Sequence, residues 1–253
     1  MKVAVISDLH ANLEASQAVY EHIRAQGIGN IVCLGDVVGY GPDPEYCVDL
    51  VRGHAQVCLM GNHDEALFLD ASDFNPHARR AIEWTRERLR PRWWSSSEAK
   101  GRWRWLQGLP NRHQLGRFLL VHGSPRDPVR EYVLSTDGFL NPGKLRGIFD
   151  AFEGVVLCGH THHPGIHTDD LRFTGLDGRD ELSIALPLGL RAVINVGSVG
   201  QPRDGDPRAC YAVLEEERVT WHRVPYEYRA TMDKILRTGV LNELLARRLA
   251  LGK

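Results

Sequence analysis

Carboxylate, carboxamide and imidazole side chains follow five short apolar segments of the sequence, at the point where each segment ends. Asp8 and His10 come after the first segment, and the other four end at Gly35-Asp36, Gly61-Asn62-His63-Asp64, His122-Gly123 and Gly159-His160-Thr161-His162. Asp, Asn and His supply the oxygen and nitrogen ligands that suit divalent transition metals. One such group after an apolar run is usually a turn or a solvated surface group, but five in series predict a metal site.

The elements that must position these side chains follow from hydrophobic patterning. The five apolar segments are expected to be buried strands, at residues 1–7, 30–34, 56–60, 117–121 and 154–158. Helices are expected over 13–25, 44–52 and 75–89, where Asn75-Pro76 resembles an N-cap with proline at the first helical position. Alternating strands and helices predict a mostly parallel sheet covered on both faces, with a site at the carboxyl ends of its strands.

The pattern changes in the second half of the chain. From about Arg172 onward, short strands without intervening helices are expected at 172–174, 192–196, 209–214 and 218–224. They predict a second, mainly antiparallel sheet packed against the first. An amphipathic helix, or a pair of helices, is expected from about Tyr228 to Leu251. The fold class is therefore α/β, and we expect residues 1–253 to form a single domain.

Composition narrows the class of protein. The chain has 253 residues, 43% hydrophobic and 25% charged, with a formal net charge of −1. These values are typical of a globular enzyme with a substantial core, and they give no overall attraction to nucleic acid. The lack of a long apolar run predicts no membrane span, and the N-terminus does not resemble a secretory signal. Five cysteines without paired spacing favour a reducing compartment, so we expect a cytoplasmic protein.

The motifs DLH, GDVVGYG, GNHD, VHG and GHTH, in this order, resemble those of the calcineurin-like metallophosphoesterases. The resemblance extends from Asp8 to about Asp206, and the segment from Asn195 to Pro202 is also typical of small prokaryotic members. It implies a two-sheet α/β sandwich flanked by helices. It also implies two divalent transition metal ions, whose identity (manganese, iron, zinc or nickel) the sequence leaves open.

The resemblance further implies a set of ligands for each ion. Asp36 would bridge the two ions. The first ion would also bind Asp8, His10 and His162, and the second would also bind Asn62, His122 and His160. The implied reaction is hydrolysis of a P–O bond by in-line attack of a hydroxide that bridges the metals. A small phosphate ester is the expected substrate.

His63 and Asp64 are the catalytic candidates outside the ligand set. By resemblance, His63 donates a proton or hydrogen bond to the leaving oxygen. Related phosphatases carry GDxxDRG, in which an aspartate orients this histidine and an arginine grips a terminal phosphate. Here Gly39 and Tyr40 stand at those two positions. The loss of the arginine favours phosphodiesters over monoesters.

Four residues are candidates for substrate binding. Tyr40 stands where the phosphatases have arginine, and Arg126 and Arg203, which follow VHGSP and Gln201-Pro202, could replace that arginine in space. Asn12 could contact a phosphate oxygen, but capping the helix that begins at Leu13 explains it equally well.

Other functions stay open at this point. Phosphomonoesterase or protein-phosphatase-like activity would use the same site. Nuclease activity would fit the segment 77–117, where five tryptophans are interleaved with arginines, although a short helix over 101–110 with Trp105 and Leu106 packed inside explains this segment better. A non-enzymatic scaffold is disfavoured because all ligand positions and His63 are present. The oligomeric state is not predictable.

Overall fold

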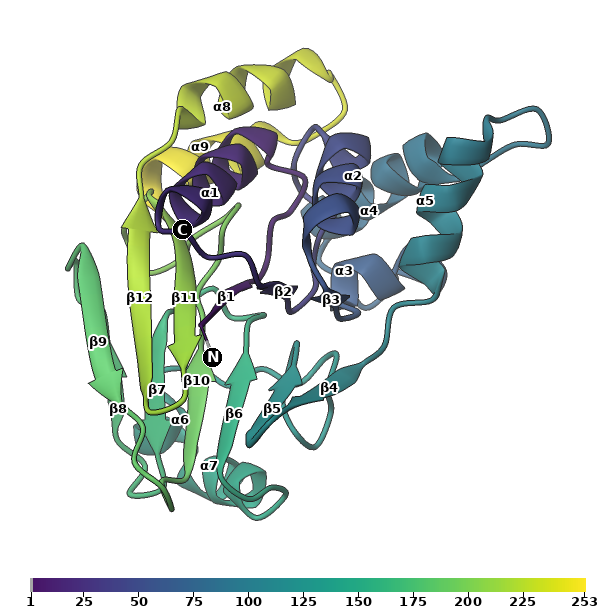
Figure 1. The fold of residues 1–253 in the computed structure, drawn as a ribbon. Helices are drawn as coiled ribbons and strands as arrows, with labels where there is room; N and C mark the ends of the chain where they lie inside the picture. Colours follow the sequence, from purple (N-terminus) through teal and green to yellow (C-terminus); the bar gives the residue numbers. More distant parts are fainter. Residues whose placement is uncertain (1) are drawn as a thin grey trace.

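The computed structural model describes residues 2–253, so Met1, where the first expected strand begins, lies outside the described residues. The described chain contains two six-stranded sheets (Figure 1). The first is built from β1 (Val3–Ile6), β2 (Ile31–Cys33), β3 (Val57–Cys58), β9 (Glu181–Ala185), β11 (Ala209–Glu215) and β12 (Arg218–Val224). The second is built from β4 (Arg112–Leu115), β5 (Phe118–Val121), β6 (Val155–Cys158), β7 (Gly165–Thr168), β8 (Phe173–Gly175) and β10 (Ala192–Asn195).

Both sheets are mixed. The order of the first is β3-β2-β1-β11-β12-β9, with the first three strands parallel and the others antiparallel. The order of the second is β4-β5-β6-β10-β7-β8, in which β5, β6 and β10 are parallel. The two-sheet fold is as expected, but the late strands divide between both sheets and do not form one of their own. β11 is buried along most of its length, which suits a position beside β1 in the middle of a sheet.

The hydrophobic core forms one layer between the two sheets and further layers between each sheet and the helices that cover it. Along β1, Val3 and Val5 face the space between the sheets, whereas Ala4 and Ile6 face the helices. This alternation follows from the two-residue period of a strand. Leu157 of the second sheet belongs to the same inner layer as Val5.

Helices cover the outer faces. The first sheet packs against α1 (Leu13–Ala25), α2 (Pro44–His54), α4 (Pro76–Leu89) and α5 (Ser97–Gln107), and the second packs against α7 (Pro142–Phe149). The C-terminal helices are α8 (Tyr228–Arg237) and α9 (Glu243–Leu251). They pack against each other, and α8 also contacts α1 (Figure 1). Two single-turn helices are α3 (Asn62–Glu65) and α6 (Asp137–Leu140). The predicted cap is confirmed, because the Asn75 side chain accepts hydrogen bonds from the backbone of His77 and Ala78.

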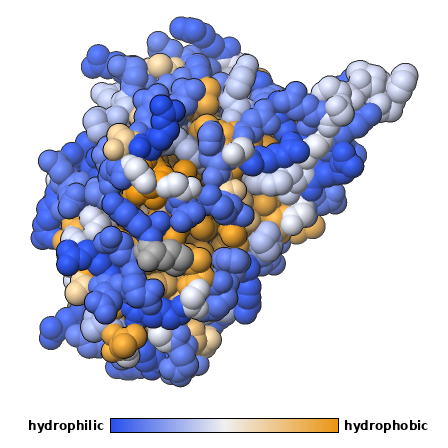
Figure 2. All heavy atoms as spheres, viewed as in Figure 1, coloured by the Kyte–Doolittle hydropathy of each residue, from blue (hydrophilic) through white to orange (hydrophobic). Residues whose placement is uncertain are grey.

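The tryptophan-rich segment is divided between core and surface. Trp105 and Leu106 of α5 pack in the helical core, as the short-helix interpretation expected, and Trp103 packs there as well. Trp93 and Trp94 are 84% and 61% exposed on the connection between α4 and α5, which projects at the upper right of Figures 1 and 2. Arg102 is paired with Asp49 of α2. Binding of nucleic acid by this segment stays a prediction.

Two features of the structure relate to the predictions about membrane spans and cysteines. Within residues 2–253, the structure contains no helix of the length and apolarity that crossing a membrane requires. All five cysteines are free and buried, and Cys33, Cys58 and Cys158 lie in β2, β3 and β6 as small core residues.

Candidate metal centre

The five motifs converge because two sets of parallel strands end at one place. β1, β2 and β3 of the first sheet and β5 and β6 of the second are each followed by one motif. Contacts between His10 and His162, and between Asn62 and His122, join the ends of the two sheets. The structure therefore brings together all seven side chains that the sequence analysis assigned to metal binding.

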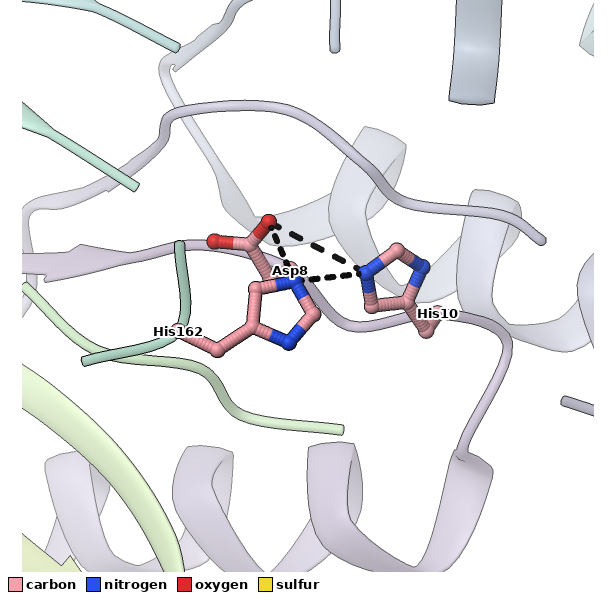
Figure 3. Close-up of side chains that lie close together, drawn as sticks. All are labelled: Asp8, His10 and His162. Atoms are coloured by element: carbon pink, nitrogen blue, oxygen red, sulfur yellow. Dashed lines mark hydrogen bonds and ion pairs between the residues drawn. The ribbon is translucent and has the colours of Figure 1, made fainter. Parts of the chain in front are cut away.

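The inner cluster consists of Asp8, His10 and His162 (Figure 3). His162 Nε2 lies 3.2 Å from Asp8 Oδ1 and 3.0 Å from His10 Nε2. His10 Nε2 is 3.9 Å from the same Asp8 oxygen. All three side chains are buried.

The cleft-side cluster consists of Asn62, His122 and His160. His122 Nε2 lies 3.2 Å from Asn62 Oδ1, and the rings of His122 and His160 are 4.9 Å apart between centroids. The backbone N–H of His160 also donates to the Asp8 carboxylate at 3.1 Å, which links this cluster to the inner one.

Asp36 lies between the two clusters. Its Oδ1 accepts a hydrogen bond of 2.8 Å from the backbone N–H of His63, which fixes the carboxylate. Its Oδ2 lies 3.7 Å from His10 Nε2 and 3.4 Å from His122 Nε2. One carboxylate oxygen is thus shared by both clusters.

Backbone carbonyl groups fix which nitrogen of each imidazole faces the centre. The Nδ1 atoms of His10, His122 and His162 contact the carbonyl oxygens of Val38, Leu34 and Gln201, at 3.3, 3.0 and 2.5 Å. His160 is turned the other way, with Nε2 at 3.0 Å from the Arg130 carbonyl. Each ring nitrogen that donates to a carbonyl leaves the other one unprotonated in the neutral ring.

This donor set fits divalent metal ions. His10 and His162 direct unprotonated Nε2 atoms at each other across 3.0 Å, an arrangement that a shared cation stabilises. Burial lowers the pKa of His10 and lowers that of His160 to about 3, so these imidazoles are neutral at pH 7, as metal binding requires. Burial alone would raise the pKa of Asp36, but the nearby His122 and His63 outweigh it and hold the carboxyl well below its usual range.

The backbone at the centre is strained. Asp8, His10, Asp36, His160 and His162 have φ values of 55°, 48°, 50°, 65° and 59°, in the left-handed region that non-glycine residues rarely adopt. Strain of this kind persists only where the surrounding structure fixes it, and it gathers at functional sites. Gly61 permits the closest approach, because a Cβ there would lie 2.1 Å from Asp36 Oδ1.

His63 lies beside the clusters and is 3% exposed. Its ring contacts those of Tyr40 and His10, with centroids 4.4 and 4.9 Å away. Its Nδ1 has no hydrogen-bond partner among the described residues, and a Cβ at Gly39 would lie 2.5 Å from it. The position that carries the orienting aspartate in GDxxDRG therefore abuts His63, and the glycine at this position has no side chain to orient the imidazole. Burial lowers the pKa of His63 to about 4.

Asp64 faces the backbone. Its carboxylate accepts hydrogen bonds from the N–H groups of Val37, Val38 and Gly61 at 3.3, 3.2 and 3.1 Å. It thereby ties the loop that carries Asp36 to the one that begins at Gly61. Burial, with a smaller contribution from Asp36, raises the pKa of Asp64 to about 7.

The structure places the four substrate-binding candidates differently. Tyr40 lies at the centre, and the Arg203 guanidinium is 5.7 Å from the centroid of its ring. Asn12 caps α1, and its amide donates to the Gly200 carbonyl and the Tyr226 hydroxyl, so both amide hydrogens are used. Arg126 is paired with Glu131 and does not line the cleft described next. Of the four, Tyr40 and Arg203 are brought to the centre.

A cleft of about 330 Å³ opens beside the cleft-side cluster. Its walls combine residues of the centre with residues that no sequence motif singled out, and they are Tyr40, Asn62, His63, Asp73, Phe74, Asn75, Arg130, Tyr132 and His160. The segments 73–75 and 130–132 stand outside the five motifs. Asn75 was predicted only as a helix cap, so no signal in the sequence placed these segments at a cleft.

Comparison with known proteins identifies relatives over the full chain. Residues 1–218 match the calcineurin-like phosphoesterase superfamily domain. An uncharacterized protein of Methanocaldococcus jannaschii is 32% identical over 260 aligned residues, which cover 99% of this chain and 98% of that protein. A metallophosphoesterase of known structure from Sphaerobacter thermophilus is 39% identical, with coverage of 100% and 99% and a TM-score of 0.83. A hypothetical protein from Pyrococcus horikoshii OT3 has the same fold at 19% identity, with coverage of 100% and 98% and a TM-score of 0.74.

Proposed function

Because the chain belongs to the calcineurin-like phosphoesterase superfamily, whose members are metal-dependent hydrolases of phosphoric esters, we propose that it is a binuclear phosphodiesterase. The observation that carries this proposal is the position of Asp36 Oδ2, within 4 Å of imidazoles from both clusters. A carboxylate shared by two sets of nitrogen and oxygen donors is the arrangement that a pair of dications requires.

In this proposal the inner cluster and Asp36 hold one divalent ion, and the cleft-side cluster and Asp36 hold the other. When bound, the pair of ions would activate water and polarise the phosphoryl oxygens. The backbone carbonyls behind each imidazole keep the donor nitrogen in place, and such outer contacts are worth about 10–100-fold in metal affinity.

His63 supplies the proton or hydrogen bond for the leaving oxygen. It lines the cleft together with Asn62 and His160, so a substrate seated there reaches it. Asp64 acts as a positioning residue, since its carboxylate joins the loops that present Asp36 and Asn62. Its three backbone hydrogen bonds explain why a carboxylate follows His63 directly.

The preference for diesters rests on the charge available at the centre. With Tyr40 in place of arginine, the guanidinium beside the Tyr40 ring is that of Arg203, whose Nη2 donates to Gln201 at 2.8 Å. A monoester dianion would gain most from a free, bidentate arginine, whereas a diester monoanion needs less positive charge. We assign Arg203 to the non-bridging oxygen of the diester.

The test compares two esters of the same alcohol. Metal-stripped protein is reloaded with manganese, iron, zinc or nickel, and the turnover of bis(p-nitrophenyl) phosphate and of p-nitrophenyl phosphate is followed. We expect metal-dependent turnover with a kcat/KM about tenfold or more higher for the diester. His63→Ala should lower diester turnover about 10²–10⁴-fold with metal content unchanged, and exposed His77→Ala is the matched control.

The outcomes separate the alternatives. A higher kcat/KM for the monoester would replace the diesterase proposal with a phosphatase. Two bound ions without turnover of either ester would argue against catalysis on such esters. A ratio of bound metal to protein below two in every reloaded sample would contradict the binuclear centre itself.

A further inference from the structure

Aromatic rings line the cleft next to the cleft-side cluster. Tyr132 lies over His160, with ring centroids 3.8 Å apart and planes at 30°. Phe74 meets His63 edge-on at 5.2 Å. Tyr40 completes the aromatic lining. The space next to the proposed reaction centre therefore presents flat apolar surfaces as well as polar groups.

Tyr132 stands out because 45% of it is exposed although it is held firmly. The segment that carries it is anchored on both sides. The Arg130 carbonyl accepts the hydrogen bond from His160, and the Arg130 guanidinium is paired with Glu65 at 2.8 Å. Val133, which follows Tyr132, is buried in the core. The ring is thus a fixed surface, open to the cleft, beside a proposed metal ligand.

Polar groups accompany the rings in the cleft. Asp73 and Asn75 are exposed residues on the connection that leads into α4. The Asn75 side-chain oxygen caps this helix, which leaves its amide hydrogens for a ligand. Asp73 offers a carboxylate. An amide and a carboxylate next to aromatic surfaces are the groups that recognise the donor and acceptor edge of a nucleobase.

We propose that this cleft is a subsite for a nucleobase attached to the scissile phosphate, so that the substrate is a nucleotide diester. The inference deepens the proposed function and rests on it. The base stacks on Tyr132, its polar edge meets Asp73 and Asn75, and the phosphate lies at the metal centre. A cleft of about 330 Å³ lies within the size range of small-molecule sites. An alkyl diester would leave the aromatic surfaces in contact with water.

The test measures binding, so it does not depend on turnover. Metal-loaded protein is titrated by calorimetry with adenosine monophosphate and with methyl phosphate, which share the phosphate group, whereas only the first carries a ribose and a base. We expect adenosine monophosphate to bind about tenfold or more tightly, as stacking on an aromatic ring predicts. Tyr132→Leu should remove most of this difference, whereas Tyr132→Phe should keep it.

Controls guard against indirect effects of Tyr132→Leu on the metal centre. Metal content is measured for each variant, and methyl phosphate affinity reports on the centre alone. Trp93→Leu removes an aromatic ring that is 84% exposed on the projecting connection, so it should leave both affinities unchanged. The wild-type comparison of the two phosphates holds whether or not the variants fold.

Equal affinities of the wild-type protein for the two phosphates would overturn the subsite. So would an equal loss of both affinities in Tyr132→Leu at full metal content, or a loss of the adenosine preference in Trp93→Leu. These results are distinguishable from failure of the proposed function. A protein that hydrolyses simple diesters without a base preference lacks only the subsite, and one that prefers adenosine monophosphate without hydrolysing diesters lacks only the activity.

Discussion

The inner and cleft-side clusters use the same kinds of ligand in different surroundings. Asp8, His10 and His162 are at most 1% exposed, and none of them lines the cleft. Asn62 and His160 are 8% and 4% exposed, and both line it. The inner cluster also has its own carboxylate, whereas the cleft-side cluster has a neutral amide in its place.

This difference indicates a division of labour within the proposed centre. A closed cluster with a full negative charge is suited to retain its ion, and an open one with an amide is suited to exchange its ion and to contact substrate. Ligand charge and access, and not the number of histidines, then distinguish the two halves. Variants and conditions that act on one half or on both test this difference.

The largest effect is expected where the two clusters meet. Asp36→Ala removes the carboxylate shared by both, so we expect loss of at least one bound ion and a fall of about 10³-fold or more in kcat/KM. Metal analysis and diester turnover measure the two effects. Asp233→Ala, at an exposed position on α8, is the matched control. Retention of both ions and of activity in Asp36→Ala would refute the bridging position.

A smaller effect distinguishes the halves directly. Asn62→Ala removes a neutral ligand from the cleft-side cluster, so we expect about 10–100-fold weaker binding of one ion while the other stays bound. In the wild-type protein, a chelator should remove the cleft-side ion first. Competition titration and the time course of metal release check both statements. A single release phase, or loss of both ions in the variant, would show that the halves are not independent.

The pH dependence of metal binding should also differ between the halves. Burial alone would lower the pKa of His122, but the Asp36 carboxylate outweighs it and raises the pKa to about 9. A metal ion at the cleft-side cluster must displace this proton, so its affinity should rise about tenfold per pH unit up to about pH 9 and then level off.

The inner ion should respond little in the same range. Burial lowers the pKa values of His10 and His162, and both rings are already neutral at pH 7. Competition titrations between pH 7 and about 9 measure both slopes. Equal slopes for the two ions would contradict the assignment of the protonated imidazole to the cleft side.

The smallest effect concerns His63. Gly39→Ala places a Cβ 2.5 Å from His63 Nδ1 at a φ of +94°, so the imidazole must shift while the metal ligands stay. We expect kcat to fall about tenfold, less than the full contribution of a general acid, with both ions bound. Gly29→Ala, where a Cβ meets nothing within 4 Å, is the control. Loss of metal in Gly39→Ala would instead couple this loop to the centre.

The residue pattern along the chain predicted those features that depend only on neighbouring residues. The helix at 13–25 and the cap at Asn75 follow from neighbouring residues, and both agree with the structure. The seven proposed ligands could be predicted because each belongs to a motif that follows a strand, and these strands end at one place in the fold. The role of Arg126 could not be judged this way, since it follows a motif yet its side chain turns to Glu131.

Features that depend on distant contacts were not predictable. Tyr132 and Phe74 belong to no motif and reach the cleft only through the packing of their loops. The division of the late strands between the sheets depends on pairs such as Val3 with Leu214, which no local periodicity encodes. A single domain, a cytoplasmic location and the identity of the metals stay predictions.

The joining of distant segments at the centre has a consequence for synthesis on the ribosome. His10 and His162 meet across 152 residues, and β1 acquires its neighbour β11 only when residues 209–215 have emerged. A nascent chain presents Asp8 and His10 long before their partners exist. We therefore expect loading with metal to be among the last events in the maturation of the chain, and a translation-arrested fragment that ends before residue 160 should leave the exit tunnel unable to form either half of the proposed centre.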